Sequence, residues 1–144
     1  MKETIGKHYV EQKYSLHDAY IKKIKVKDET ITIEFKDGYY TIGEDDCMPV
    51  KGHLKFHGAD LDFCNVYVLN THGYFGKFKG RKYSLKKFVK KHQKVSMEIV
   101  DETYGCGMAK FMGFMYVGKK RKIKEFIIEL SYYAGSMKYV TEEL

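Results

Sequence analysis

The sequence predicts a mainly β protein that is built as an antiparallel two-layer sandwich or a partly closed barrel. The alternative fold class is α+β. Two observations predict this class. Apolar and polar residues alternate along several segments, which is typical of strands with one buried face. The 144 residues include 13 Tyr and 9 Phe, with one Pro and no Trp, and aromatic rings pack well on a pleated sheet. We expect about seven or eight strands and one helix, in a single domain of residues 1–144.

The first hairpin can be read together with its register. Two arms in which isoleucine and valine alternate with lysine, threonine and glutamate flank Asp28-Glu29. Folding the arms about this turn predicts two cross-strand pairs on one buried face, Val26 with Ile31 and Ile24 with Ile33. Residues 1–18, which precede the hairpin, are expected to form an arm or a short first strand.

Short strands and turns are expected in the middle of the chain. Residues 39–42 and 53–57 suit short strands, and residues 61–69 suit a longer, central strand because both of its faces are apolar. Residues 43–52 contain three consecutive acids and the only Pro between glycines, which indicates a loop.

One helix is expected near residues 84–92. Ser84 can serve as the N-cap, because its hydroxyl can accept a hydrogen bond from a free amide of the first turn. Leu85, Phe88, Val89 and His92 recur at helical spacing and form one inward stripe, while lysines project from the other side.

A second hairpin is expected from residues 106–117 and 123–132, after a strand at 95–100, and residues 137–144 are interpreted as a tail. Folding the hairpin about the turn after Val117 predicts favourable cross-strand pairs: Gly113 with Phe126, Phe111 with Ile128 and Lys110 with Glu129. The outer side of this hairpin is also apolar. We therefore expect the basic helix or a second subunit to cover it, which leaves a homodimer open.

Positive charge is concentrated in one part of the chain. The net charge is +7, and residues 77–94 contain Lys and Arg but no Asp or Glu. Aromatic rings alternate with cations from residue 74 onward, a composition used to bind single-stranded nucleic acid or an acidic partner, although the RNA-recognition signature is not matched. A solvated surface is the plainer interpretation. The candidate partner-binding residues are Tyr74, Phe75, Lys77, Lys79, Arg81, Lys86 and Lys90.

The histidines give no pattern typical of a metal site or a catalytic site, and no cofactor is expected. His53 and His57 would lie about 13 Å apart on a strand, too far to share one ion. His17 and Asp18 would point to opposite faces of an extended backbone. We therefore expect Asp18 to cap a turn and His17 to pack or to bond to the backbone.

A cytosolic location is the expectation from the cysteines and the N-terminal residues. Cys47, Cys64 and Cys106 are odd in number and widely spaced, which favours free thiols that behave as small buried hydrophobes. The first residues lack the apolar stretch of a secretory signal, and no segment reaches the ~18 apolar residues of a membrane span.

The segment Ser15-Leu16-His17-Asp18-Ala19-Tyr20-Ile21, with the hairpin that follows it, resembles the opening of certain small bacterial β-domains. In these domains a Leu-His-Asp-(Ala/Ser) motif precedes the first hairpin, and some are grouped as immunity proteins of polymorphic toxin systems, the immunity-50-like type. The resemblance covers residues 15–36. It implies a cytosolic, non-enzymatic β-domain in which His17 and Asp18 are architectural, and it names no ligand.

The function that these patterns favour is non-catalytic binding of a protein partner in a bacterial cytosol, with toxin neutralisation as its specific form. Two alternatives stay open. One is a small-molecule-binding barrel or sandwich with Tyr, Phe and Met inside, which would contain a cavity of ~300 Å³ or more. The other is a nucleic-acid-binding domain that uses residues 77–94. An enzyme is less expected, because no nucleophile or acid–base pair is indicated.

Overall fold

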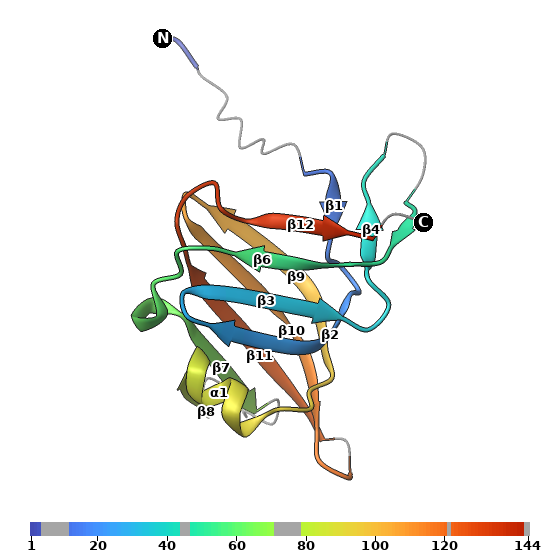
Figure 1. Ribbon diagram of the computed structural model, residues 1–144, viewed down its shortest axis with the longest axis vertical. Helices are drawn as coiled ribbons and strands as arrows, with labels where there is room; N and C mark the ends of the chain where they lie inside the picture. Colours follow the sequence, from blue (N-terminus) through green and yellow to red (C-terminus); the bar gives the residue numbers. More distant parts are fainter. Residues whose placement is uncertain (4–11, 44–46, 71–78, 121, 143–144) are drawn as a thin grey trace.

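The computed structural model describes residues 1–3, 12–43, 47–70, 79–120 and 122–142 (Figure 1). Strands account for 57% of the structure and helices for 8%, so the prediction of a mainly β sandwich with one α-helix is confirmed. The strand pairs within the described ranges are all antiparallel. Neither helical segment in these ranges has the length and apolar character that crossing a bilayer requires.

Nine strands form one large sheet in the order β12-β6-β3-β2-β9-β10-β11-β7-β8. Their bounds are β2 Tyr20–Lys27, β3 Thr30–Phe35, β6 Gly52–Phe56, β7 Asn65–Asn70, β8 Gly80–Ser84, β9 Met97–Gly105, β10 Met108–Val117, β11 Lys122–Ser131 and β12 Lys138–Thr141. Three short strands form a second sheet in the order β1-β4-β5, namely β1 Tyr14–Ser15, β4 Tyr39–Thr41 and β5 Pro49–Val50.

The large sheet folds back on itself and so produces two layers. The junction is between β2 and β9, which pair through Tyr20 with Glu98 and Ile21 with Met97. In Figure 1, β6, β3 and β2 run across β9, β10 and β11, which lie behind them. The two inner faces enclose a core that includes the fully buried Ile31, Ile33, Leu54, Phe56, Ile99, Phe111, Phe126 and Ile128.

Both predicted hairpin registers are confirmed. Val26 pairs with Ile31 and Ile24 with Ile33 across the two-residue turn between β2 and β3. Ile24, Ile31 and Ile33 are buried and Val26 is half-buried. In the second hairpin, the three expected pairs of β10 with β11 all occur: Gly113 with Phe126, Phe111 with Ile128 and Lys110 with Glu129.

The helix α1 (Leu85–Lys91) begins and ends as expected. The Ser84 hydroxyl accepts a hydrogen bond from the Lys87 amide at 3.3 Å, and Leu85 and Phe88 are buried. The helix contacts β8, β2 and β7. It therefore does not cover the outer side of the β10–β11 hairpin, where Phe114 and Ile123 stay exposed. That expectation for the helix was wrong, and coverage by a second subunit stays a prediction.

Several boundaries differ from those expected. The predicted strand 61–69 begins only at Asn65, because residues Leu61–Phe63 form a 3₁₀ turn, η1. This turn is closed by the Phe63 amide bonding to Asp60 O at 2.9 Å. The predicted tail contains β12, which pairs with β6, and the predicted loop 43–52 contains β5. β12 pairs with a segment far away in sequence, and β5 has only two residues and pairs with the preceding β4, which explains why both were missed from the sequence.

Candidate functional site

The bulge in β2 positions a cluster of lysines beside α1. Lys22 and Lys23 lie between the buried Ile21 and Ile24, and the register with β3 shifts between Ile21 and Lys23. A bulge places an extra residue in the strand and re-aims its side chains. Lys22 and Lys23 are both exposed as a result.

Between β2 and α1 lies a hollow of about 830 Å³, which we name the lysine-lined groove. Its aliphatic lining comes from Ile24, Val26, Val89 and Val95, and its cations are Lys22, Lys23, Lys25, Lys90 and Lys94, with Gln93 beside them. Among the described residues that line it, none is acidic and none is aromatic. The groove therefore offers an apolar floor with a positively charged rim.

The lysines of β2 act on a neighbouring carboxylate. A hydrogen bond from Lys25, whose Nζ lies 2.6 Å from Oε1 of Glu34, lowers the pKa of Glu34, and the charges of Lys22 and Lys23 lower it further. At the end of α1, burial lowers the pKa of His92, and the charges of Lys91 and Lys124 add to this effect. Among the lysines that line the groove, Lys25 forms an ion pair with a carboxylate in the described part of the chain, and that carboxylate is Glu34.

The candidate residues chosen from the sequence are divided by the fold. Lys90 lines the lysine-lined groove, and Lys86 is exposed on α1. Lys79 and Arg81 belong to β8 or its approach and line a separate hollow of about 180 Å³ with Lys124. Tyr74, Phe75 and Lys77 lie outside the described residues.

Lys22, Lys23 and Lys25 were not among the candidates, because the alternation indicated only a solvent-exposed hairpin face for Lys23 and Lys25 and assigned no role to Lys22. The Lys22-Lys23 doublet between two isoleucines breaks the alternation, and this break was the available signal for a bulge. Their nearness to Lys90 could not be read from the chain, since β2 and α1 are distant in sequence.

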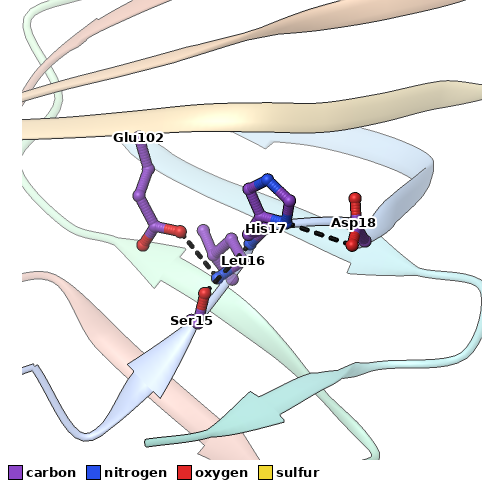
Figure 2. Close-up of polar contacts among 5 residues, drawn as sticks. All are labelled: Ser15, Leu16, His17, Asp18 and Glu102. Atoms are coloured by element: carbon purple, nitrogen blue, oxygen red, sulfur yellow. Dashed lines mark hydrogen bonds and ion pairs between the residues drawn. The ribbon is translucent and has the colours of Figure 1, made fainter.

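The Leu16-His17-Asp18 segment forms a tight turn beside β9 (Figure 2). The Ala19 amide bonds to Leu16 O at 2.9 Å, the Asp18 amide bonds to Ile99 O at 2.8 Å, and Asp18 has a left-handed φ of 65°. The turn expected at Asp18 is present, but the contact that its carboxylate makes is with His17, so the expected capping role is not confirmed. The backbone is not extended here, so the side chains meet on one side, with His17 Nδ1 3.1 Å from Asp18 Oδ2.

His17 itself differs from the expectation that it packs or bonds to the backbone. Its side chain is 58% exposed and contacts the Asp18 carboxylate, which is 60% exposed. The pair therefore lies on open surface.

The cysteines and the histidines in the described ranges are dispersed. All three cysteines are free, as expected, but Cys47 and Cys106 are exposed and only Cys64 is buried. Burial raises the pKa of the Cys64 thiol. His57 lies just beyond β6, with Nδ1 3.4 Å from the Thr30 hydroxyl. In the described ranges, His, Cys, Asp and Glu side chains form no group of three or more that could hold a metal ion.

No protein-family model, curated protein or solved structure matches this chain.

Proposed function

We propose that this protein is a non-catalytic binding domain that takes an acidic segment of a partner protein in the lysine-lined groove. The observation that carries the proposal is the composition of the groove, in which five lysines surround four aliphatic side chains. A partner segment with Glu or Asp on its edges and aliphatic residues between them would match both parts. Opposite charges on two surfaces steer association and favour the correct partner.

The same composition favours a protein over a single-stranded nucleic acid. Proteins that bind single strands combine cations with aromatic rings on which bases stack. The described residues that line the groove supply the cations but no ring. Their apolar groups are aliphatic, and such groups suit the side chains of a peptide.

The resemblance of residues 15–36 to immunity-type domains supports a specific form of this proposal. In that form the partner is a bacterial protein toxin and binding neutralises it. We also propose a cytoplasmic location. The exposed free thiols of Cys47 and Cys106 support it, because such thiols persist in a reducing compartment.

The experiment compares charge reversal in the groove with an equal reversal elsewhere. The variant K22E/K90E changes the groove, and K36E/K138E is the matched control, because Lys36 and Lys138 are exposed and do not line it. The probes are a peptide in which Glu and Leu residues alternate and a single-stranded DNA of equal net charge. Fluorescence anisotropy gives the affinity of each across a series of salt concentrations.

We expect the peptide to bind more tightly than the DNA, and K22E/K90E to weaken peptide binding by about tenfold or more. K36E/K138E should bind as the wild type does. If the DNA binds more tightly than the peptide, K22E/K90E weakens that binding, and the logarithm of the affinity falls with the logarithm of salt concentration by roughly 0.7 per contacted phosphate, the groove binds nucleic acid and the proposal of a protein partner is wrong. Equal peptide affinities for the two charge variants would overturn the groove as the binding site.

A cellular assay tests the toxin partner. We expect the gene immediately upstream to encode the toxin, so its product is expressed alone and together with this protein, and growth is measured. Wild type and K36E/K138E should restore growth, whereas K22E/K90E should not. Restoration by all three would contradict neutralisation through the groove.

A further inference from the structure

A second hollow, of about 420 Å³, is lined by aromatic side chains. We name it the tyrosine-lined pocket. Tyr14 of β1, Tyr104 of β9, Tyr139 of β12 and Tyr132 just after β11 contribute their rings, and Met137 lies beside them. These elements gather at the end of the sandwich away from α1 (Figure 1). The volume lies within the range of small-molecule sites, which are mostly apolar with a few oriented polar groups.

The hydroxyl groups of Tyr139 and Tyr104 form a relay that ends on a carboxylate. The Tyr104 hydroxyl donates to Oε1 of Glu102 at 2.8 Å, and it lies 3.4 Å from the Tyr139 hydroxyl. A phenol has a single proton to donate. Because the Tyr104 proton goes to Glu102, Tyr139 is the donor in the Tyr139–Tyr104 hydrogen bond.

Glu102 is held in place by the turn at the start of the first hairpin. Its Oε2 accepts the Leu16 amide at 2.7 Å (Figure 2), and Leu16 is fully buried. The Glu102 carboxylate is thus held next to the Tyr104 hydroxyl by two hydrogen bonds. This contact links the Leu-His-Asp segment to the wall of the pocket.

The proton of the Tyr132 hydroxyl is directed at the protein as well. Its acceptors are Met108 O at 3.4 Å and Met137 Sδ at 4.0 Å. Three phenols therefore direct their protons at the protein and leave oxygen lone pairs, which carry negative electrostatic potential. Beside them, the rings of Tyr14 and Tyr139 pack together with their centroids 4.9 Å apart. Burial, with the charge of Glu102 adding to it, raises the pKa of Tyr139 to about 12, so this phenol stays neutral at pH 7.

We propose that the tyrosine-lined pocket binds a small organic cation whose methylated ammonium group lies against the tyrosine rings. Aromatic faces attract such cations, and sites built from several rings recognise quaternary ammonium groups. The Glu102 carboxylate behind Tyr104 adds to the attraction. Lys13 is the one cation among the described lining residues; it is exposed, and its long side chain can turn its charge into water.

This site is separate from the proposed function. The lysine-lined groove takes a large acidic partner beside α1, whereas the tyrosine-lined pocket takes a small cation at the other end of the sandwich. The two sites share no lining residue. A failed test of one therefore leaves the other standing.

The experiment uses choline and its uncharged isostere dimethylbutanol, in which carbon replaces the nitrogen. Since the chain has no Trp and 13 Tyr, a change in fluorescence reports binding near tyrosines in general, and chemical-shift changes of the pocket residues give the affinity and the place of binding. We expect choline to bind about tenfold more tightly than dimethylbutanol. Equal affinities would show a merely apolar pocket, and acetate binding or no choline binding would also overturn the proposal.

Variants locate the binding. Y14L removes a ring and should weaken choline binding by about tenfold, while Y14F keeps the ring and should bind as the wild type does. Y133L is the matched control, because Tyr133 is 75% exposed and does not line the pocket. Circular dichroism checks that each variant folds. Equal losses of choline affinity in Y14L and Y133L, or a complete loss of binding in Y14F, would contradict recognition of the cation by the ring of Tyr14 in the tyrosine-lined pocket.

Discussion

Replacing Gly113 of β10 with alanine should force apart two strands in the back layer of the sandwich. A Cβ at this position would lie 1.8 Å from the carbonyl oxygen of Glu98 and 3.0 Å from the amide nitrogen of Val100. Both atoms belong to the backbone of β9, next to the register shift between Met112 and Gly113. Cβ contacts under 3.0 Å essentially do not occur, and no side-chain rotation can relieve a clash with backbone, so β9 has to move.

The expected magnitude follows from the cost of overpacking a tight interior. Forced backbone shifts of this kind cost about 1–3 kcal/mol, and the entropy gained by replacing glycine offsets only about 0.4–1 kcal/mol. The free energy of unfolding of G113A should therefore fall by roughly 1–2 kcal/mol. For a chain of this size that lowers Tm by roughly 3–8 °C.

Urea unfolding followed by tyrosine fluorescence measures the change, with G105A as the matched control. Gly105 ends β9, and a Cβ there would meet nothing closer than the Met108 Cβ at 3.8 Å, an ordinary contact. G105A should unfold at the wild-type urea concentration or slightly above it. If the two variants have the same midpoint and the same slope, the argument from the close approach of β9 is refuted.

Three further predictions concern titration and reactivity. The variant E34Q should lose less than about 1 kcal/mol at pH 7, because the Lys25–Glu34 ion pair is partly exposed. The pKa of Glu34 is lowered by folding. Its contribution to the free energy of unfolding is therefore present above the unfolded pKa of about 4.3 and disappears as the pH falls through the folded pKa. When the free energy of unfolding is measured against pH, the curves of wild type and E34Q should converge in acid. The pKa of Tyr39 is raised to about 12, first by burial, as is that of Tyr139. Stability should therefore be at its full value below pH 10 and decline between pH 10 and 12, and tyrosinate absorbance that rises in one step near pH 10 would contradict this. A thiol reagent should modify the two exposed cysteines at once and Cys64 only on unfolding; mass spectrometry identifies the sites, and modification of Cys64 in the folded protein would count against its burial.

The hairpins were the most predictable part of the fold. A two-residue turn follows Lys27, and both arms alternate strictly from Ile24 onward, so register and buried face are determined by neighbours in sequence. The helix was predictable for a similar reason, since the Ser84 cap and the Leu85–Phe88 spacing act within two turns. The strand predicted for residues 61–63 was wrong. Their apolar character is typical of a strand, but the hydrogen bond from the Phe63 amide to Asp60 O closes a turn instead.

The sites depended on contacts that no local pattern contains. Lys22 and Lys90 share the lysine-lined groove only because the large sheet folds back at β2 and α1 packs across β2 and β8. The tyrosine-lined pocket needs β1, β9 and β12 together, and the sequence near each tyrosine says nothing of the others.

The sequence alone therefore determined the class of fold, the two hairpin registers, the capped helix and the excess of positive charge. These features depend on alternation, spacing and composition, which act between residues close together along the chain. The tertiary structure decided which lysines and tyrosines become neighbours, where Glu102 is anchored and which cysteine is buried. These outcomes require packing between distant segments, and the free energy that selects such packing belongs to the whole core rather than to any single stretch of sequence.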